Sequence, residues 1–314
     1  MNNNFQKPEN PDEERDFNDN HLSPTMSPIA AAFIGLVFVF ILYQIAGSLL
    51  TLLIFGFDLE SANMNAMRLM TIAGQVLFIL LPALIFAKLI YEDVGTIIRF
   101  KLPNWKEILA FVIGLALLSP LLQSYLYIQT YIIDELAKHV SIVHSIKEVL
   151  DSLDKLVTET YSELLRAESI FEGSFIIIVV AVVPAICEEV FFRGYVQKSF
   201  ELSIKPVWAI ILTALFFAMY HFNPYGLVAL VALGIFFGFA AYKSGSIFIP
   251  MILHFLNNLL AVVMFFVLGV DEFMQVESID PSEIGINIIL FIFFLVLFLG
   301  YILVLRKQYH KLKN

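Results

Sequence analysis

Two adjacent carboxylates, Glu188 and Glu189, lie within a strongly apolar run, residues 175–196. Placing an ionisable side chain at the centre of a membrane helix costs roughly 2.5–3.5 kcal/mol on insertion scales, and such residues usually mark functional sites. Carboxylates serve as general bases in enzymes, and two that have different surroundings can take different roles in acid/base chemistry. We therefore take this acid pair as the start of a candidate catalytic site.

The helical neighbours of the two carboxylates differ. In a helix, Glu189 and Arg193 lie four residues apart on one face, in the order that favours an ion pair. Glu188 points about 100° away from Glu189, and Phe191 and Phe192 are its neighbours on the next turn. Apolar neighbours disfavour a charged carboxylate, which makes Glu188 the better candidate for a general base. A purely structural Glu–Arg pair remains the alternative, and it applies more readily to Glu189.

Two histidines follow the acid pair. His221 lies at the end of one predicted span, and His254 lies early in a later one, four residues before Asn258. That spacing places His254 and Asn258 on one helix face. A single histidine in a membrane bundle is often a structural donor between helices, but two histidines with an amide and an acid pair indicate a site. We expect both histidines to face Glu188, and Asn258 rather than Asn257 to lie beside them.

Three motifs follow one another on successive predicted membrane helices: Glu-Glu-x-x-x-Arg, Phe-x-x-x-His and His-x-x-x-Asn. In this order they resemble the motifs of the CPBP (CAAX protease and bacteriocin-processing) family of intramembrane proteases, which includes the type II CAAX prenyl endopeptidases. The resemblance covers roughly residues 173–265, a stretch set by the positions of the motifs along the chain. The residues that carry it are Glu188, Glu189, Arg193, Phe217, His221, His254 and Asn258.

The resemblance implies an endopeptidase that hydrolyses peptide bonds of membrane-associated proteins or peptides. In the mechanism described for the family, the first glutamate and the first histidine prepare a water molecule for attack. Carried over, Glu188 is the base and His221 orients the water. The second histidine and the asparagine, here His254 and Asn258, would stabilise the oxyanion. Some relatives act on prenylated substrates, but the sequence shows no prenyl pocket.

Metal dependence stays open at this stage. Members of the family are often labelled metalloproteases, and Glu188, His221 and His254 would form a zinc set of two histidines and one carboxylate. The sequence contains no His-Glu-x-x-His motif, which is the usual helix-borne zinc signature. If Glu188 bound zinc, Glu189 would have to act as the base. We favour a mechanism without a cofactor, with a zinc-dependent variant as the alternative.

Cys187, the single cysteine of the chain, directly precedes the acid pair. A cysteine protease would need a thiolate beside a histidine. Burial in an apolar helix favours the neutral and unreactive thiol, so we do not expect Cys187 to be a nucleophile.

Composition places the chain among polytopic membrane proteins with an all-α helix bundle. Of its 314 residues, 59% are hydrophobic and 15% are charged, against about 25% charged in soluble domains. Runs this long and apolar must satisfy their backbone groups within helices. The net charge of −9 gives no support for a nucleic-acid partner, so the lipid bilayer and a membrane-associated substrate are the expected partners. The eight predicted spans are 28–56, 67–90, 106–128, 173–199, 206–222, 224–243, 246–269 and 284–305.

Basic residues lie at or beyond the ends of alternate spans, which predicts that they lie on the cytoplasmic side of the cell membrane together with both termini. They are Arg99, Lys101, Lys106, Arg193, Lys198, Lys205, Lys243, Arg306, Lys307, Lys311 and Lys313. The predicted regions are a disordered acidic N-terminal tail (1–27), N-terminal spans (28–128), an extracytoplasmic connection (129–172), the catalytic core (173–269), and a C-terminal span with a basic tail (270–314).

The connection 129–172 contains no proline, and its apolar residues recur at spacings of three and four. This pattern predicts an amphipathic helix or helical hairpin. The helix could lie at the membrane interface against the bundle or the lipid headgroups, or it could gate substrate access as a lid. Both roles remain open.

Two other functions compete with proteolysis. A non-catalytic membrane scaffold or immunity protein of the same fold would keep its activity when Glu188 is replaced. A transporter would use the acid pair as a proton relay, and it would need helices broken around a midplane site. Pro184 provides one such break, but the sequence shows no matching half.

Overall fold

A computed structural model describes residues 22–56, 63–268 and 280–313. Within these ranges the secondary structure is helical and contains no strand, so the predicted all-α bundle is confirmed. Most of the predicted N-terminal tail, residues 1–21, lies outside the described part of the chain.

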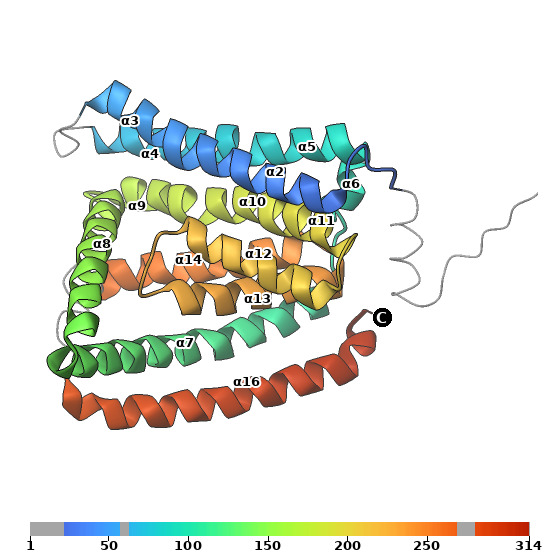
Figure 1. The fold of residues 1–314 in the computed structure, drawn as a ribbon. Helices are drawn as coiled ribbons and strands as arrows, with labels where there is room; N and C mark the ends of the chain where they lie inside the picture. Colours follow the sequence, from blue (N-terminus) through green and yellow to red (C-terminus); the bar gives the residue numbers. More distant parts are fainter. Residues whose placement is uncertain (1–21, 57–62, 269–279, 314) are drawn as a thin grey trace, which may run out of the picture.

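Two long antiparallel helices form the N-terminal part of the bundle, and each contains a wider π-helical segment (Figure 1). The first ends at Gly56, whose φ of 78° suits a residue without a side chain. The second is followed by a single helical turn whose cap is the Asp93 carboxylate. The elements are α2 (Pro28–Phe40), η1 (Ile41–Ala46) and α3 (Gly47–Phe55), then α4 (Met64–Gly74), η2 (Gln75–Leu80), α5 (Leu81–Tyr91) and α6 (Val94–Ile97).

The amphipathic connection forms two helices rather than a separate hairpin. Helix α7 (Trp105–His139) starts with a capping box between Asn104 and Glu107 and continues well past the predicted end of its span at residue 128. Helix α8 (Ser141–Leu165) then runs across one end of the bundle, whereas the long helices run between the two ends (Figure 1). Its last turn is fastened to α4, because Arg68 donates hydrogen bonds to the carbonyl oxygens of Leu164 and Arg166.

The remaining helices hold the candidate motifs. A continuous helix consists of α9 (Ile170–Ile177), η3 (Ile178–Val182), α10 (Val183–Glu189), η4 (Val190–Val196) and α11 (Gln197–Glu201). It is followed by α12 (Pro206–Tyr220), α13 (Leu227–Ser244), α14 (Phe248–Leu268), the short η5 (Pro281–Glu283) and α16 (Ile284–Lys313).

Seven helices of the described chain are long and apolar enough to span a membrane. The remaining predicted span, 206–222, corresponds to α12, which has only 15 residues. At 1.5 Å per residue this helix is about 22 Å long, shorter than the ~30 Å hydrocarbon core. It ends early because the chain turns after Tyr220, with a positive φ at Phe222 and a proline at 224.

The first residues of α2 and the C-terminal end of α16 lie at the same end of the bundle, and α8 crosses the opposite end (Figure 1). The start of the first span and the end of the last span therefore lie on the same side, as the predicted orientation of the chain requires. Which end faces the cytoplasm stays a prediction, as do the boundaries of the five predicted regions.

The helix formed by α9 to α11 is the centre of the bundle. In an 18-residue apolar stretch of this helix, 56% of the residues are buried inside the structure. In the corresponding stretch of the helix that includes α16, 6% are buried. Around it pack α2, α5, α12, α13 and α14, whereas α16 packs along α7. A charged group on the central helix must therefore find its partners inside the protein.

Close contact between α12 and α13 depends on Gly234. A Cβ at this position would lie 2.9 Å from the Cβ of Ala214 and 3.1 Å from its Cα, and small residues permit such approach between membrane helices. We expect Gly234→Ala to lower the free energy of unfolding by about 1–3 kcal/mol, the usual cost of overpacking. Thermal unfolding of the purified protein in detergent measures the change.

Gly300→Ala is the matched control. Gly300 also lies within a helix, but a Cβ there would meet no atom within 4 Å. Its unfolding midpoint should stay the same or rise slightly, because alanine is the better helix former. Equal midpoints for the two variants would show that the α12–α13 contact is less tight than described.

Candidate active site

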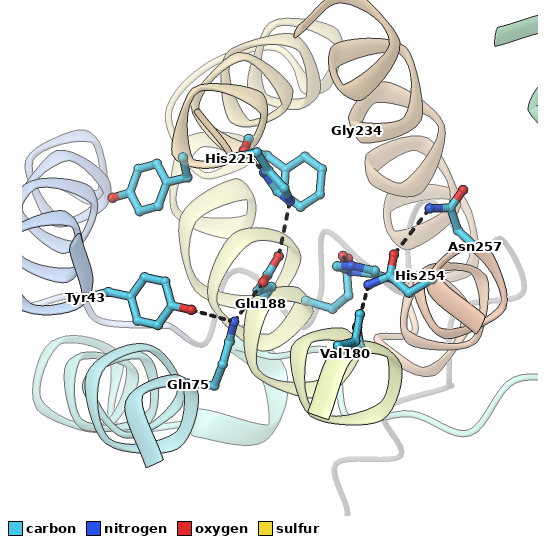
Figure 2. Close-up of polar contacts among 12 residues, drawn as sticks. Tyr43, Gln75, Val180, Glu188, His221, Gly234, His254 and Asn257 are labelled. Atoms are coloured by element: carbon cyan, nitrogen blue, oxygen red, sulfur yellow. Dashed lines mark hydrogen bonds and ion pairs between the residues drawn. The ribbon is translucent and has the colours of Figure 1, made fainter. Parts of the chain in front are cut away.

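Glu188 and His221 meet across an antiparallel helix pair. The chain turns at residues 202–205 between α11 and α12, and the two side chains lie at nearly equal distances along the chain from that turn. Oε2 of Glu188 is 3.8 Å from Nε2 of His221 (Figure 2). The side chains are 13% and 24% exposed, respectively, so the site is shielded but not sealed. The predicted contact between these two residues is present.

The hydrogen bond on the other side of the His221 ring determines its tautomer. Nδ1 lies 2.7 Å from the carbonyl oxygen of Phe217, and a carbonyl oxygen only accepts. Nδ1 therefore carries the proton, and in the neutral ring Nε2 presents a lone pair to Glu188. Oε2 of Glu188 has no hydrogen-bond partner within the described residues. The two facing atoms are both acceptors, and one water molecule can donate a hydrogen to each of them.

Glu189 forms a separate, fully buried cluster. Its Oε1 lies 2.9 Å from Nη1 of Arg193 and 2.8 Å from Nδ1 of His254. The side chains of Glu189 and Arg193 are both 0% exposed. The ion pair predicted from the spacing of four residues is therefore present. Arg193, which the sequence analysis also counted among the cytoplasmic-side basic residues, lies in the interior instead.

His254 contacts Glu189, whereas the sequence analysis expected it to face Glu188. Consecutive residues of a helix point about 100° apart. Glu188 is thereby directed toward the end of α12, and Glu189 toward α13 and α14. Each histidine therefore pairs with its own carboxylate.

The ring of Phe217 lies among the ionisable groups. Its centroid is 4.2 Å from Cζ of Arg193, 4.5 Å from the His221 ring and 5.9 Å from the His254 ring. A guanidinium over an aromatic face is stabilised by the ring quadrupole, most strongly when water is absent. Phe217 thus separates the two polar clusters and supports the buried charge of Arg193.

Asn258 reaches the central helix from α14. Its Nδ2 donates to the carbonyl oxygen of Val180 at 3.0 Å, and its Oδ1 accepts from Nδ2 of Asn257 at 3.3 Å. One N–H of the Asn258 amide is then left for another acceptor. Asn258 therefore lies against the central helix at Val180, which is eight residues before Glu188 along the chain. The choice of Asn258 over Asn257 as the site amide stays a prediction.

The structure also brings in two polar residues that the sequence analysis did not identify. Nε2 of Gln75 lies 3.0 Å from Oε1 of Glu188 and 3.2 Å from the hydroxyl of Tyr43 (Figure 2). Both residues come from the N-terminal spans, outside the three motifs. A glutamine within the predicted span 67–90 was a signal of this contact, because polar side chains in membrane helices usually face the interior of the bundle.

Each of the four π-helical segments in the described chain supplies a group to the site or its surroundings. Tyr43 lies in η1, Gln75 begins η2, Val180 lies in η3 and Arg193 lies in η4. Such segments are rare and occur frequently at functional sites. They change the direction of side chains along a helix and leave carbonyl groups such as that of Val180 able to accept other hydrogen bonds.

A metal ion does not fit the described side chains. Among the residues described, no three His, Cys, Asp or Glu side chains are arranged to hold one. The candidate zinc set divides between the two clusters, since His221 faces Glu188 and His254 is bonded to Glu189. Cys187 is 2% exposed and packs in the apolar core with Val190 and Phe191, the environment of an inert thiol.

Helix α8 lies close to the site. Its C-terminal end is bonded to Arg68 of α4, and α8 also packs against α9; α4 and α9 belong to the long helices that carry Gln75 and Glu188. The other end of α8 is held by Lys147, which forms ion pairs with Asp134 and Asp151. This position is compatible with both roles considered for α8, an interfacial helix and a substrate-gating lid.

Removing Arg193 should destabilise the protein strongly, because Glu189 would keep a buried charge without its cation. We expect Arg193→Met to lower the free energy of unfolding by about 3–5 kcal/mol, the usual cost of breaking a buried pair. The double variant Glu189→Gln with Arg193→Met should recover a large part of this loss, since it leaves no uncompensated charge. Unfolding in detergent tests both; a double variant as unstable as the single one would contradict the ion-pair interpretation.

Comparison with known proteins gives a result for the part of the chain that contains the site. A family model described as type II CAAX prenyl endopeptidase Rce1-like matches residues 171–260. No curated protein and no solved structure matches the chain. The matched segment holds all three motifs, from the acid pair to Asn258. The resemblance to the CAAX protease family is therefore confirmed for this segment, which is similar to the Rce1-like type II CAAX prenyl endopeptidases.

Proposed function

We propose that this protein is an intramembrane endopeptidase that uses Glu188 to activate a water molecule. The observation that carries the proposal is the pair of facing acceptors, Oε2 of Glu188 and Nε2 of His221, 3.8 Å apart in a shielded site. A water molecule that donates to both atoms keeps a lone pair free for attack. With His221 neutral, the two facing acceptors cannot bond to each other, so a donor such as this water molecule is needed between them.

In the proposed reaction, Glu188 takes a proton from the water as its oxygen attacks the carbonyl carbon of the scissile peptide bond. A carbon–oxygen bond forms, and the carbonyl oxygen becomes an oxyanion. Glu188 then gives the proton to the leaving nitrogen as the carbon–nitrogen bond breaks. The products are a carboxyl group and an amine, and the base is regenerated. This use of one residue as base and then acid is common in hydrolases.

His254 and Asn258 are the proposed donors to the oxyanion. The free N–H of the Asn258 amide can donate directly. Because Nδ1 of His254 donates to the Glu189 carboxylate, its Nε2 can donate to the oxyanion only when the ring carries a second proton. A single oxyanion donor is typically worth roughly 3 kcal/mol of barrier.

Glu189 then has an orienting role rather than that of a base. Its Oε1 is shared between Arg193 and His254 and fixes the His254 ring. A buried carboxylate that holds a catalytic imidazole in place is a recurring arrangement in hydrolases. The proposed mechanism uses no metal, because the clusters of Glu188 and Glu189 separate the three candidate ligands.

The proposed substrates are membrane-associated proteins or peptides. The matching family model is described as a type II CAAX prenyl endopeptidase. Prenylated CAAX peptides are therefore one of the two substrate classes to test, and transmembrane peptides are the other. The proposed location is the cell membrane, with both termini on the cytoplasmic side.

Replacing the base tests the proposal. Purified protein in lipid vesicles would be incubated with a farnesylated CAAX peptide, the same peptide without the lipid, and a transmembrane model peptide. We expect wild type to cleave at least one peptide, and Glu188→Gln to lower kcat on the order of 10²–10⁴-fold, the usual contribution of a general base. His221→Ala should cause a loss of similar order. Equal cleavage by all three proteins would refute the roles of Glu188 and His221, and no cleavage of any peptide by wild type would favour the non-catalytic scaffold.

Treatment with a chelator tests whether catalysis requires a metal ion. Treatment of wild type with a strong chelator, followed by removal of the chelator–metal complex, should leave kcat unchanged. Readdition of Zn²⁺ should not increase it. Activity that is lost with the chelator and restored by Zn²⁺ would show that the zinc-dependent variant of the mechanism is correct.

A further inference from the structure

Gln75 is a buried amide directed into the candidate site from outside the three motifs. It begins the π-helical segment η2 on the second long helix, and it is 4% exposed. Its Nε2 lies between Oε1 of Glu188 at 3.0 Å and the hydroxyl oxygen of Tyr43 at 3.2 Å (Figure 2). Both distances are within the range of ordinary hydrogen bonds.

The chemistry of its partners fixes which way the Gln75 amide points. An ionised carboxylate only accepts hydrogen bonds, so the atom that faces Glu188 must be the nitrogen. In the opposite orientation, the amide oxygen would face the carboxylate oxygen and repel it. Tyr43 accepts the second N–H of the amide, so both hydrogens of the nitrogen are used.

The contact distinguishes the two oxygens of Glu188. Oε1 is held by Gln75, whereas Oε2 has no partner within the described residues and faces His221. A glutamate side chain has several rotatable bonds, and a free one would lose about 1.5–2 kcal/mol of rotamer entropy when fixed. A donor on Oε1 fixes the carboxylate before the substrate binds, as preorganised sites require.

We propose that Gln75, supported by Tyr43, is a positioning residue that holds Oε1 of Glu188 so that Oε2 faces His221 and the attacking water. This inference rests on the proposed function. It extends the site to the N-terminal helices, because η1 and η2 then determine the geometry of a base carried by α10. The matched family segment, residues 171–260, contains neither Gln75 nor Tyr43.

Gln75→Leu tests the role, because leucine has a similar volume and no donor. With whichever peptide wild type cleaves, kcat should fall on the order of 100-fold, the effect of a small misplacement of a reacting group. KM should stay within about two-fold, since Gln75 does not contact substrate. Gln75→Glu, which places a second carboxylate against Glu188, should lower kcat at least as much. Tyr43→Phe should have a smaller effect, because Gln75 keeps its contact with Glu188.

Gln197→Leu is the matched control. Gln197 is 0% exposed, and its amide donates to Glu201 and to the carbonyl of Gly238, at the end of the central helix. Both variants remove a buried amide, so both should lower the unfolding midpoint. Only Gln75→Leu should lower kcat per folded molecule. An equal fall in kcat for the two variants would show that Gln75 acts through stability alone.

A double-mutant cycle separates this inference from the proposed function. In a Glu188→Gln background, adding Gln75→Leu should change the residual rate by less than about two-fold, since residues that act as a unit are not additive. If Gln75→Leu keeps the wild-type kcat while Glu188→Gln is inactive, the positioning role is wrong and the function stands. If Glu188→Gln is as active as wild type, both are wrong.

Discussion

The interaction on which the site depends is the buried contact of Glu189 with Arg193. Neither side chain is exposed, and an unpaired ion in such a position costs several kcal/mol. The pair is stable because Arg193 also lies over Phe217 and approaches the carbonyl of Gly234, while Glu189 also accepts from His254. These contacts reach α12, α13 and α14 from the central helix. The need to neutralise one charge therefore sets the positions of the helices that carry the other site residues.

The helices direct their polar groups into the site through π-helical segments rather than through loops. Loops within hydrocarbon would expose backbone groups that find no partner, whereas an extra residue in a helical turn keeps the helix and redirects its side chains. On the central helix, η3 leaves the Val180 carbonyl to accept from Asn258, and η4 begins directly after Glu189. On the N-terminal helices, η1 and η2 carry Tyr43 and Gln75. The site is thus built from irregular turns inside otherwise regular spans.

The sequence was sufficient for the class of fold and for the contacts that depend on local spacing. The Glu189–Arg193 pair follows from the period of one helix, and the contact of Glu188 with His221 was expected from their motifs. The partner of His254 was predicted incorrectly, because it depends on how α14 is rotated against α10, which no local pattern specifies. A glutamine within an apolar span indicated an interior position for Gln75, but its contacts with Glu188 and Tyr43 depend on how the N-terminal helices pack against α10. The length of α12 was overestimated, since apolar residues continue into the turn after Tyr220.

The different surroundings of the two carboxylates explain why Glu188, rather than Glu189, is suited to be the proposed base. Both hydrogen-bonded contacts of Glu189 are to groups that can carry positive charge, and both are made by one oxygen. Protonating Glu189 would weaken the interaction that keeps Arg193 in the interior, so each turnover would disturb the packing of three helices. Within the described residues, the polar contacts of Glu188 are to the neutral amide of Gln75 and the imidazole of His221, and its side chain is partly exposed. Its charge can therefore change during a reaction while the charge that holds the bundle together stays constant.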